Sequence, residues 1–309
     1  MAVLRSHFSY IKLSSRSNEM AADQEFRVIV ATDGSDNARD AVTTARHFPW
    51  PAATRARVVV ARRSPSEYRR SIRLTALDRG AEIAADHARR VLTPRWPDLD
   101  IVIVDKAPVT AVLDQAKRFG ADVIVVGWRG HGAVRRALMS SVSRGIVRGA
   151  ACAVLVVRRS RRVRRIVVGL DQTPHASRAL AFVERLVPPA RGRVTLATAV
   201  TLTTLPSRRV AFAARELARE VKRTNVIRTQ RATKELNRAA ARLKAKGWDA
   251  RTALTTGEPL NDLMGAVKAS RAHLLVVGAK GTSGVRHLLL GSVAEGALSR
   301  SPIPVLIAR

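Results

Sequence analysis

The sequence predicts an α/β protein built from two tandem, doubly wound domains, each containing a parallel sheet of five strands. Three observations lead to this class. Short apolar runs rich in valine and isoleucine recur along the chain, as expected of strands buried on both faces. Stretches with helical periodicity separate these runs, which is typical of a parallel sheet covered by helices. One glycine-containing segment also occurs twice, as VVGWRGHGAVRRALMSSVSRGIV at 125–147 and VVGAKGTSGVRHLLLGSVAEGAL at 276–298.

A second pair of matching segments supports the repeat. FRVIVATDGSDNARDAV begins at Phe26 and RRIVVGLDQTPHASRAL begins at Arg164, and each reads as an apolar strand that ends in an aspartate and leads into a helix. The second copy is longer between its aspartate and its glycine segment, and the charged, helix-forming stretch Thr201–Lys246 is the expected place for the extra residues. The repeat therefore predicts domains at 26–158 and 163–309.

The residues outside these domains are few. The first 25 residues are basic and rich in serine, without the continuous apolar region of a secretory signal, and read as a disordered tail or as a start assigned too early, with Met20 as the true first residue. The linker RRSRRVRR at 158–165 is short, so the two domains are expected to contact each other.

The elements follow the apolar pattern in order. Within each domain, strands and helices are expected to alternate with right-handed crossovers. The run around Arg251 is the weakest because it alternates instead of staying apolar, and Gly120 is expected just after a helix end. The predicted strands are Val28–Ala31, Val58–Ala61, Ile101–Val104, Val123–Val126, Ala153–Val157, Ile166–Leu170, Val194–Val200, Arg251–Leu254, Leu274–Val277 and Val305–Ile307.

Composition limits the class of protein. The chain has 309 residues, of which 46% are hydrophobic, so a packed core is expected and global disorder is not. Its one cysteine, Cys152, excludes an internal disulfide and favours a reducing, cytoplasmic compartment. No apolar run reaches the roughly 18 residues that span a bilayer.

The formal net charge of +31 allows two interpretations. A surface this basic can bind nucleic acid or an anionic membrane without sequence specificity. Alternatively, the charge is spread over solvated helix faces, and the arginine run at 158–165 is a solvated turn between domains. Because aromatic residues make up only 4%, stacking platforms for single strands are scarce, and only weak, nonspecific nucleic-acid binding is expected.

The second glycine segment has the features of an anion site. The strand ends at Gly278, Gly281 and Gly284 follow, and Gly291 with Ser292 opens a helix that runs to about Arg300. Ligands bind beyond the carboxyl ends of parallel strands, and backbone N–H groups at a helix start attract phosphate. Asp171 ends the first strand at the same edge, where it suits a ribose hydroxyl or an amino group. The simpler interpretation is that the glycines only form turns and caps.

These residues together resemble the universal stress proteins in their tandem two-domain form. ATP-binding members of that family carry G-x₂-G-x₉-G-(S/T) after the fourth strand. The second copy matches the motif fully, whereas the first copy has a serine in place of the third glycine, and the second copy has Gln172-Thr173 where Gly-Ser usually follows the aspartate. The matching or aligned positions are Gly278, Gly281, Gly291 and Ser292 in the second copy, and Asp33, Gly127, Gly130, Ser140 and Ser141 in the first.

The resemblance implies a Rossmann-like fold of the adenine nucleotide alpha hydrolase-like type, with ATP bound in the cleft and Mg²⁺ held mainly by the phosphates. It implies that Ala199 contacts adenine, that Val293 belongs to the binding set beside Ser292, and that the last strands of the two domains pair within the chain. Assembly into a homodimer stays open. The function implied is that of an ATP-binding regulator in the stress response, with a nucleic-acid-binding stress protein and a weak ATPase as alternatives.

The sequence contains no convincing catalytic set. Cys152 begins an apolar strand and reads as a core residue. His131 and His287 lie in the two glycine loops, where each is a phosphate contact or a solvent-exposed side chain. If the backbone at the third glycine has a positive φ, Ser140 costs about 1–2 kcal/mol there, so the second domain is expected to bind ATP more tightly than the first.

Overall fold

The computed structural model describes residues 25–62, 73–129, 139–171, 173–203, 214–280 and 290–309. All ten predicted strands are present, with ends that differ by a few residues from those expected. The elements of the first half are β1 (Phe26–Ala31), α2 (Asp36–His47), β2 (Thr54–Arg62), α3 (Arg73–Leu92), β3 (Asp100–Asp105), α4 (Pro108–Phe119), β4 (Val123–Gly127), α5 (Ser141–Gly149) and β5 (Ala153–Val157). Those of the second half are β6 (Arg165–Gly169), α6 (Pro174–Arg185), β7 (Arg193–Ala199), α7 (Ala214–Ala245), β8 (Asp249–Thr255), α8 (Pro259–Ala269), β9 (Leu274–Gly278), α9 (Ser292–Arg300) and β10 (Val305–Ala308).

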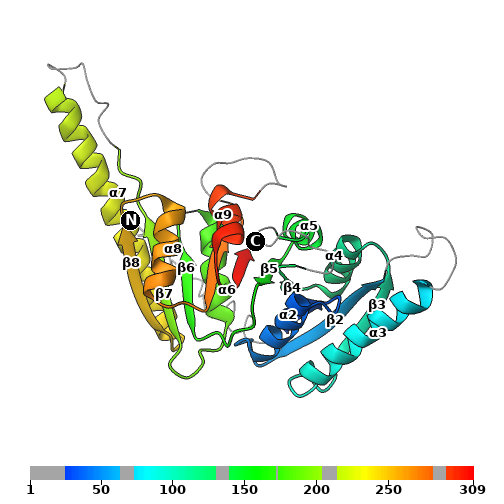
Figure 1. Cartoon of the computed structure of the whole chain (residues 1–309). Helices are drawn as coiled ribbons and strands as arrows, with labels where there is room; N and C mark the ends of the chain where they lie inside the picture. Colours follow the sequence, from blue (N-terminus) through cyan, green and yellow to red (C-terminus); the bar gives the residue numbers. More distant parts are fainter. Residues whose placement is uncertain (1–24, 63–72, 130–138, 172, 204–213, 281–289) are drawn as a thin grey trace, which may run out of the picture.

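All ten strands belong to one sheet, in the order β3-β2-β1-β4-β5-β10-β9-β6-β7-β8 (Figure 1). Within each half the neighbouring strands are parallel, which confirms the predicted α/β class with two tandem parallel units. The halves join through β5 and β10, which pair antiparallel with Leu306 opposite Leu155. The prediction that the two last strands pair within the chain is therefore confirmed.

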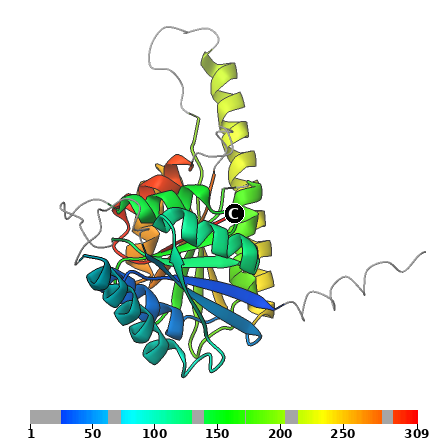
Figure 2. The same cartoon turned by 90° about the vertical axis from the view of Figure 1, so that its right-hand side faces the viewer.

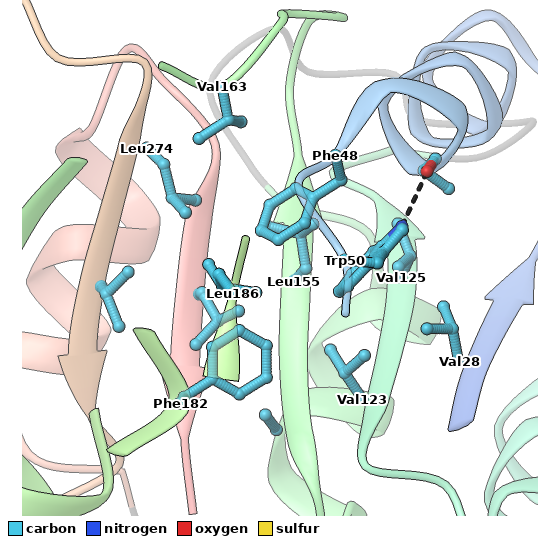
Figure 3. Packing of buried hydrophobic residues seen from close by; sticks show 14 of the residues in the cluster. Val28, Phe48, Trp50, Val123, Val125, Leu155, Val163, Phe182, Leu186 and Leu274 are labelled. Carbon is cyan, nitrogen blue, oxygen red and sulfur yellow. Dashed lines mark hydrogen bonds between the residues drawn. The ribbon is translucent and has the colours of Figure 1, made fainter. Parts of the chain in front are cut away.

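Two layers of helices cover the sheet, and each layer packs on a core that continues through both halves. One core joins residues of α2, α3, α6 and α7, and the other joins residues of α4, α5, α8 and α9. Figure 3 shows Phe48 and Trp50 of the first half facing Phe182 and Leu186 of the second. The Trp50 Nε1–H donates to the Ala45 carbonyl at 2.8 Å, so this buried indole is satisfied. The two halves therefore share a continuous hydrophobic core on each face of the sheet.

Helix α7 contains the extra length of the second half, as expected from the stretch Thr201–Lys246. It spans 32 residues, whereas its counterpart α3 spans 20. Its C-terminal part buries Leu236 and Leu243 against the sheet, and its N-terminal part projects beyond the sheet (Figures 1 and 2). Across the described ranges, no helix is both long enough and apolar enough to cross a membrane.

Local sequence signals set several helix ends. Gly120 follows α4 with φ 63°, a left-handed conformation that favours glycine, as predicted. Helix α9 runs from Ser292 to Arg300, as expected. The linker differs from expectation at Arg158, whose Nη2 donates to the carbonyl oxygens of Leu298 and Ser299 at 2.9 and 2.7 Å. Arg158 is thus bound to the end of α9 and is not part of a solvated arginine run.

Candidate functional site

A cavity of about 600 Å³ opens at the carboxyl ends of four parallel strands of the second half, β6, β7, β8 and β9. This is the sheet edge where the sequence predicts a ligand. The structure brings five of the predicted site residues into its wall, namely Asp171, Ala199, Gly278, Ser292 and Val293. The wall also contains Thr201, Arg228, Asp262, Lys280 and Ala294.

One end of this cleft is the start of α9. Gly291 is the N-cap residue, and its own N–H donates to the Ala279 carbonyl at 2.8 Å. Because glycine has no side chain to accept from the first turn, the N–H groups of the residues that follow are left for water or a ligand. Ser292, Val293 and Ala294 all line the cavity, so the positive end of the helix dipole faces it. This arrangement suits an anion.

The backbone at Gly291 corrects one expectation. Its φ is −68°, and φ at the equivalent Ser140 is −62°, values that any residue adopts. The premise of a positive φ is therefore wrong, and Ser140 carries no backbone strain. Instead, the Ser140 Oγ caps α5 by accepting from the Ser143 N–H at 3.0 Å. Ser141, the first residue of α5, lies at the position of Ser292.

The first-strand aspartates form matching turns in the two halves. Oδ1 of Asp33 accepts from the backbone N–H and the hydroxyl of Ser35, at 3.1 and 2.6 Å. Oδ1 of Asp171 accepts from the same two groups of Thr173, at 3.3 and 2.5 Å. The second half lacks the usual Gly-Ser sequence, yet its threonine supplies the bonds that the serine supplies in the first half.

Gly127 and Gly278 have a packing role that the sequence does not reveal. A Cβ atom added to Gly278 would lie 2.6 Å from the backbone carbon of His175 in α6, and one added to Gly127 would lie 2.7 Å from that of Asn37 in α2. Both glycines are needed so that a helix can approach the strand end closely. This packing explains the two glycines without any ligand. Gly130, Gly281, His131 and His287 lie outside the described residues.

The charges of the cleft are mixed. Lys280 and Arg228 contribute cations, while Asp171 and Asp262 contribute carboxylates. Oδ2 of Asp262 accepts from the Gly257 N–H at 2.8 Å. Beside the cleft, burial and then the charges of Arg178 and Lys280 lower the pKa of His175. In the part of the chain that the structure describes, no three His, Cys, Asp or Glu side chains come together as a metal site.

Sequence reasoning missed three of these cleft residues. Lys280 lies inside the glycine segment, so its position two residues after Gly278 was a usable signal. Asp262 belongs to the segment TGEPLNDLM, but no spacing rule placed its side chain in the cleft. Arg228 comes from the middle of α7, far from any motif, and only the fold brings it to the cavity.

Comparison with known proteins agrees with the tandem arrangement of two similar α/β units. The model of the Universal stress protein family matches residues 26–158 and again 162–309. The chain therefore belongs to the universal stress protein family, with two such domains in tandem.

Individual relatives support the assignment. Universal stress protein Mb2028c of Mycobacterium bovis is 25% identical over 307 residues, covering 91% of this chain and 96% of that relative. YxiE of Bacillus subtilis is 34% identical over 94 residues, which are 30% of this chain and 59% of YxiE. The crystal structure of a universal stress protein from Archaeoglobus fulgidus shares the fold with a TM-score of 0.61, at 17% identity over 93% of this chain and 99% of its own.

Proposed function

We propose that the cleft of the second half binds ATP or another adenine nucleotide, and that the protein acts as a nucleotide-dependent regulator in the stress response. The observation that carries the proposal is the start of α9, where N–H groups without a side-chain cap line the same cavity as Lys280 and Asp171. A helix N-terminus with a nearby lysine binds phosphate through charge-assisted hydrogen bonds.

The wall residues suggest how the nucleotide lies. The phosphates meet the first turn of α9, the Ser292 hydroxyl and Lys280. The ribose lies beside Asp171. Both hydrogen bonds from Thr173 to this carboxylate use Oδ1, so Oδ2 accepts from a ribose hydroxyl. The base then points toward the end of β7, where Ala199 lines the cavity. Any Mg²⁺ is held mainly by the phosphate oxygens.

Binding, and not turnover, is the activity that we propose. Rapid hydrolysis of ATP needs a group that orients water and a cation that stabilises the charge developing on the transferred phosphoryl group. Lys280 supplies a cation. Among the described residues, we assign no side chain as the base that would orient the attacking water. A weak ATPase remains the alternative, and release of phosphate from ATP by the purified protein tests it.

The proposal is tested on the whole chain. Nucleotide retained after purification is identified by absorbance and mass spectrometry, and ATP is then titrated by calorimetry. Lys280→Ala should weaken ATP binding by roughly tenfold, the size expected when one charge-assisted contact to phosphate is lost. Lys268→Ala, on an exposed position of α8, removes the same charge outside the cleft and serves as the matched control. No ATP binding by the unaltered chain, or equal affinity in both variants, would contradict the proposal.

A further inference from the structure

Helix α7 is bonded to one wall of the cleft. Asn225 holds Thr203 through two hydrogen bonds, since its Oδ1 accepts from the Thr203 N–H and its Nδ2 donates to the Thr203 carbonyl, both at 3.0 Å. One turn further on, Arg228 Nη1 donates to the Thr203 hydroxyl at 3.0 Å and to the Thr201 carbonyl at 3.4 Å. The segment that follows β7 is therefore fixed against the helix.

This wall lies at the end of the cleft opposite the anion-binding end. Thr201 and Arg228 line the cavity on the side of β7. The strand order β9-β6-β7-β8 separates that side from Lys280 and α9, which follow β9. A nucleotide with its phosphates at α9 must therefore direct its base toward Arg228.

The state of the Arg228 side chain suits contact with a base. The bonds to the wall use Nη1 alone and fix the guanidinium, which remains exposed at the cavity. Within the described ranges, no ion pair joins Arg228 to a carboxylate. A planar guanidinium held over an aromatic ring is attracted to its face, and arginine does this better than lysine.

We propose that Arg228 closes the base end of the cleft and stacks its guanidinium on the nucleobase, which makes α7 part of the nucleotide site. Asn225 is a positioning residue that orders the wall on which Arg228 rests. This inference rests on the proposed function and adds the group that recognises the base. According to this inference, Arg228 contacts the base itself and does not only attract the phosphates through its positive charge.

Two probes separate these effects in the full-length protein. ATP carries both a base and phosphates, whereas inorganic tripolyphosphate carries no base. Arg228→Ala and Arg228→Lys should each raise the Kd for ATP by roughly 3- to 10-fold, because both remove the planar contact. The Kd for tripolyphosphate should stay within about twofold of the wild-type value in Arg228→Lys, which keeps the positive charge. Arg231→Ala, on an exposed position of the same helix that does not line the cavity, should change neither.

Four outcomes would overturn the inference. Wild-type affinity for ATP in Arg228→Lys would show that charge alone matters. Parallel losses of ATP and tripolyphosphate, equal in Arg228→Ala and Arg231→Ala, would show a long-range effect. Failure of the unaltered chain to bind ATP would refute the proposed function and this inference with it, whereas ATP binding that is unchanged in both Arg228 variants would refute the inference alone. Circular dichroism confirms that each variant is folded.

Discussion

Arg158 and Arg309 each bind the end of a helix that belongs to the other half of the chain. Arg158 follows β5 and donates to the Leu298 and Ser299 carbonyls of α9. Arg309 follows β10, and its Nη2 donates to the Val147 and Arg148 carbonyls of α5 at 2.5 and 3.3 Å. Each guanidinium thus binds carbonyls of the last turn, at the negative end of a helix dipole.

Because each arginine binds a helix of the other half, each should stabilise the folded chain as a whole. Arg158→Ala and Arg309→Ala should each lower the free energy of unfolding by about 1.5–3 kcal/mol, the range for hydrogen bonds to a charged group. Arg158 also lies 3.6 Å above the Trp128 ring centre, so its removal should have the larger effect. Urea unfolding followed by tryptophan fluorescence and by circular dichroism measures both values.

Arg159→Ala is the control, because Arg159 is the exposed neighbour of Arg158 and its loss changes the net charge equally. Loss of stability as large in this control as in Arg158→Ala would show that charge, and not helix capping, is responsible. The two probes should report one transition, because the core continues through both halves.

Exchange of the two N-cap residues should affect stability and binding in opposite ways. Gly291→Ser should stabilise α9 by about a few tenths of a kcal/mol, because serine caps better than glycine and φ of −68° accepts it. The new hydroxyl would accept from the Ala294 N–H, as Ser140 does from Ser143, and would compete with phosphate. ATP affinity should therefore fall by roughly threefold or more.

The converse change, Ser140→Gly, should destabilise α5 slightly and strengthen nucleotide binding in the first half. Thermal unfolding measures the change in stability, and titration with ATP measures the change in affinity. Both use the whole chain, because a separated half would expose the strand that pairs at the centre of the sheet. If Gly291→Ser were to leave ATP affinity unchanged, the first turn of α9 would not be a phosphate contact.

Stability should fall on mild acidification because of His273. Its Nδ1 accepts from the Arg164 N–H at 3.2 Å, and Nε2 lies 2.8 Å from Nη2 of Arg165. Burial, and then the charges of Arg165, Arg161 and Arg164, lower the pKa of His273 from its usual 6.5. Above that pH the ring is neutral in both states. As the pH falls below it, the unfolded chain takes up the proton first, so the free energy of unfolding decreases until the lower folded pKa is passed.

Urea unfolding at about pH 7.5 and about pH 5.5 measures this decrease. His273→Gln keeps an acceptor but does not titrate, and should reduce the decrease. Part of it should remain, because burial also lowers the pKa values of His87 and His175. An identical pH dependence in wild type and His273→Gln would rule out this origin.

The net charge of +31 predicts weak, sequence-independent binding to duplex nucleic acid that falls steeply with salt. Among the first four arginines of the linker, Arg158 is bound to α9, which leaves Arg159, Arg161 and Arg162 for phosphate. Replacing these three with alanine should lower the slope of log K against log salt by at most about three. Fluorescence anisotropy over a salt series measures it. No binding even at low salt would remove the hypothesis.

Much of the fold could be predicted from the sequence because strands buried on both faces produce continuous apolar runs. The pairing of β5 with β10 was implied by the resemblance to the family, and the apolar runs of both strands agree with it, since an apolar strand at a sheet edge needs a cover. Predictions about backbone conformation were weaker. A glycine at position 291 suggested a positive φ, but the structure shows an ordinary N-cap.

The candidate site divides in the same way. Asp171 closely follows a strand, Gly278 ends one and Ser292 begins a helix, so local pattern and topology were enough to bring them to one edge. Arg228 lies on a surface-like helical stretch rich in arginine, and nothing in its neighbours separates it from the others. Its place depends on how far α7 projects and where the chain after β7 returns, which are properties of the assembled fold.

The central pairing also has a consequence for synthesis on the ribosome. In the finished protein all residues of β5 are buried, and β10 covers the free side of that strand. β10 is the last of the ten strands in chain order. The edge of β5 therefore stays uncovered while the second half is synthesised. Two nascent or refolding chains can meet at this edge before their own β10 arrives. Recovery of correctly folded protein after denaturation should therefore decline as protein concentration rises.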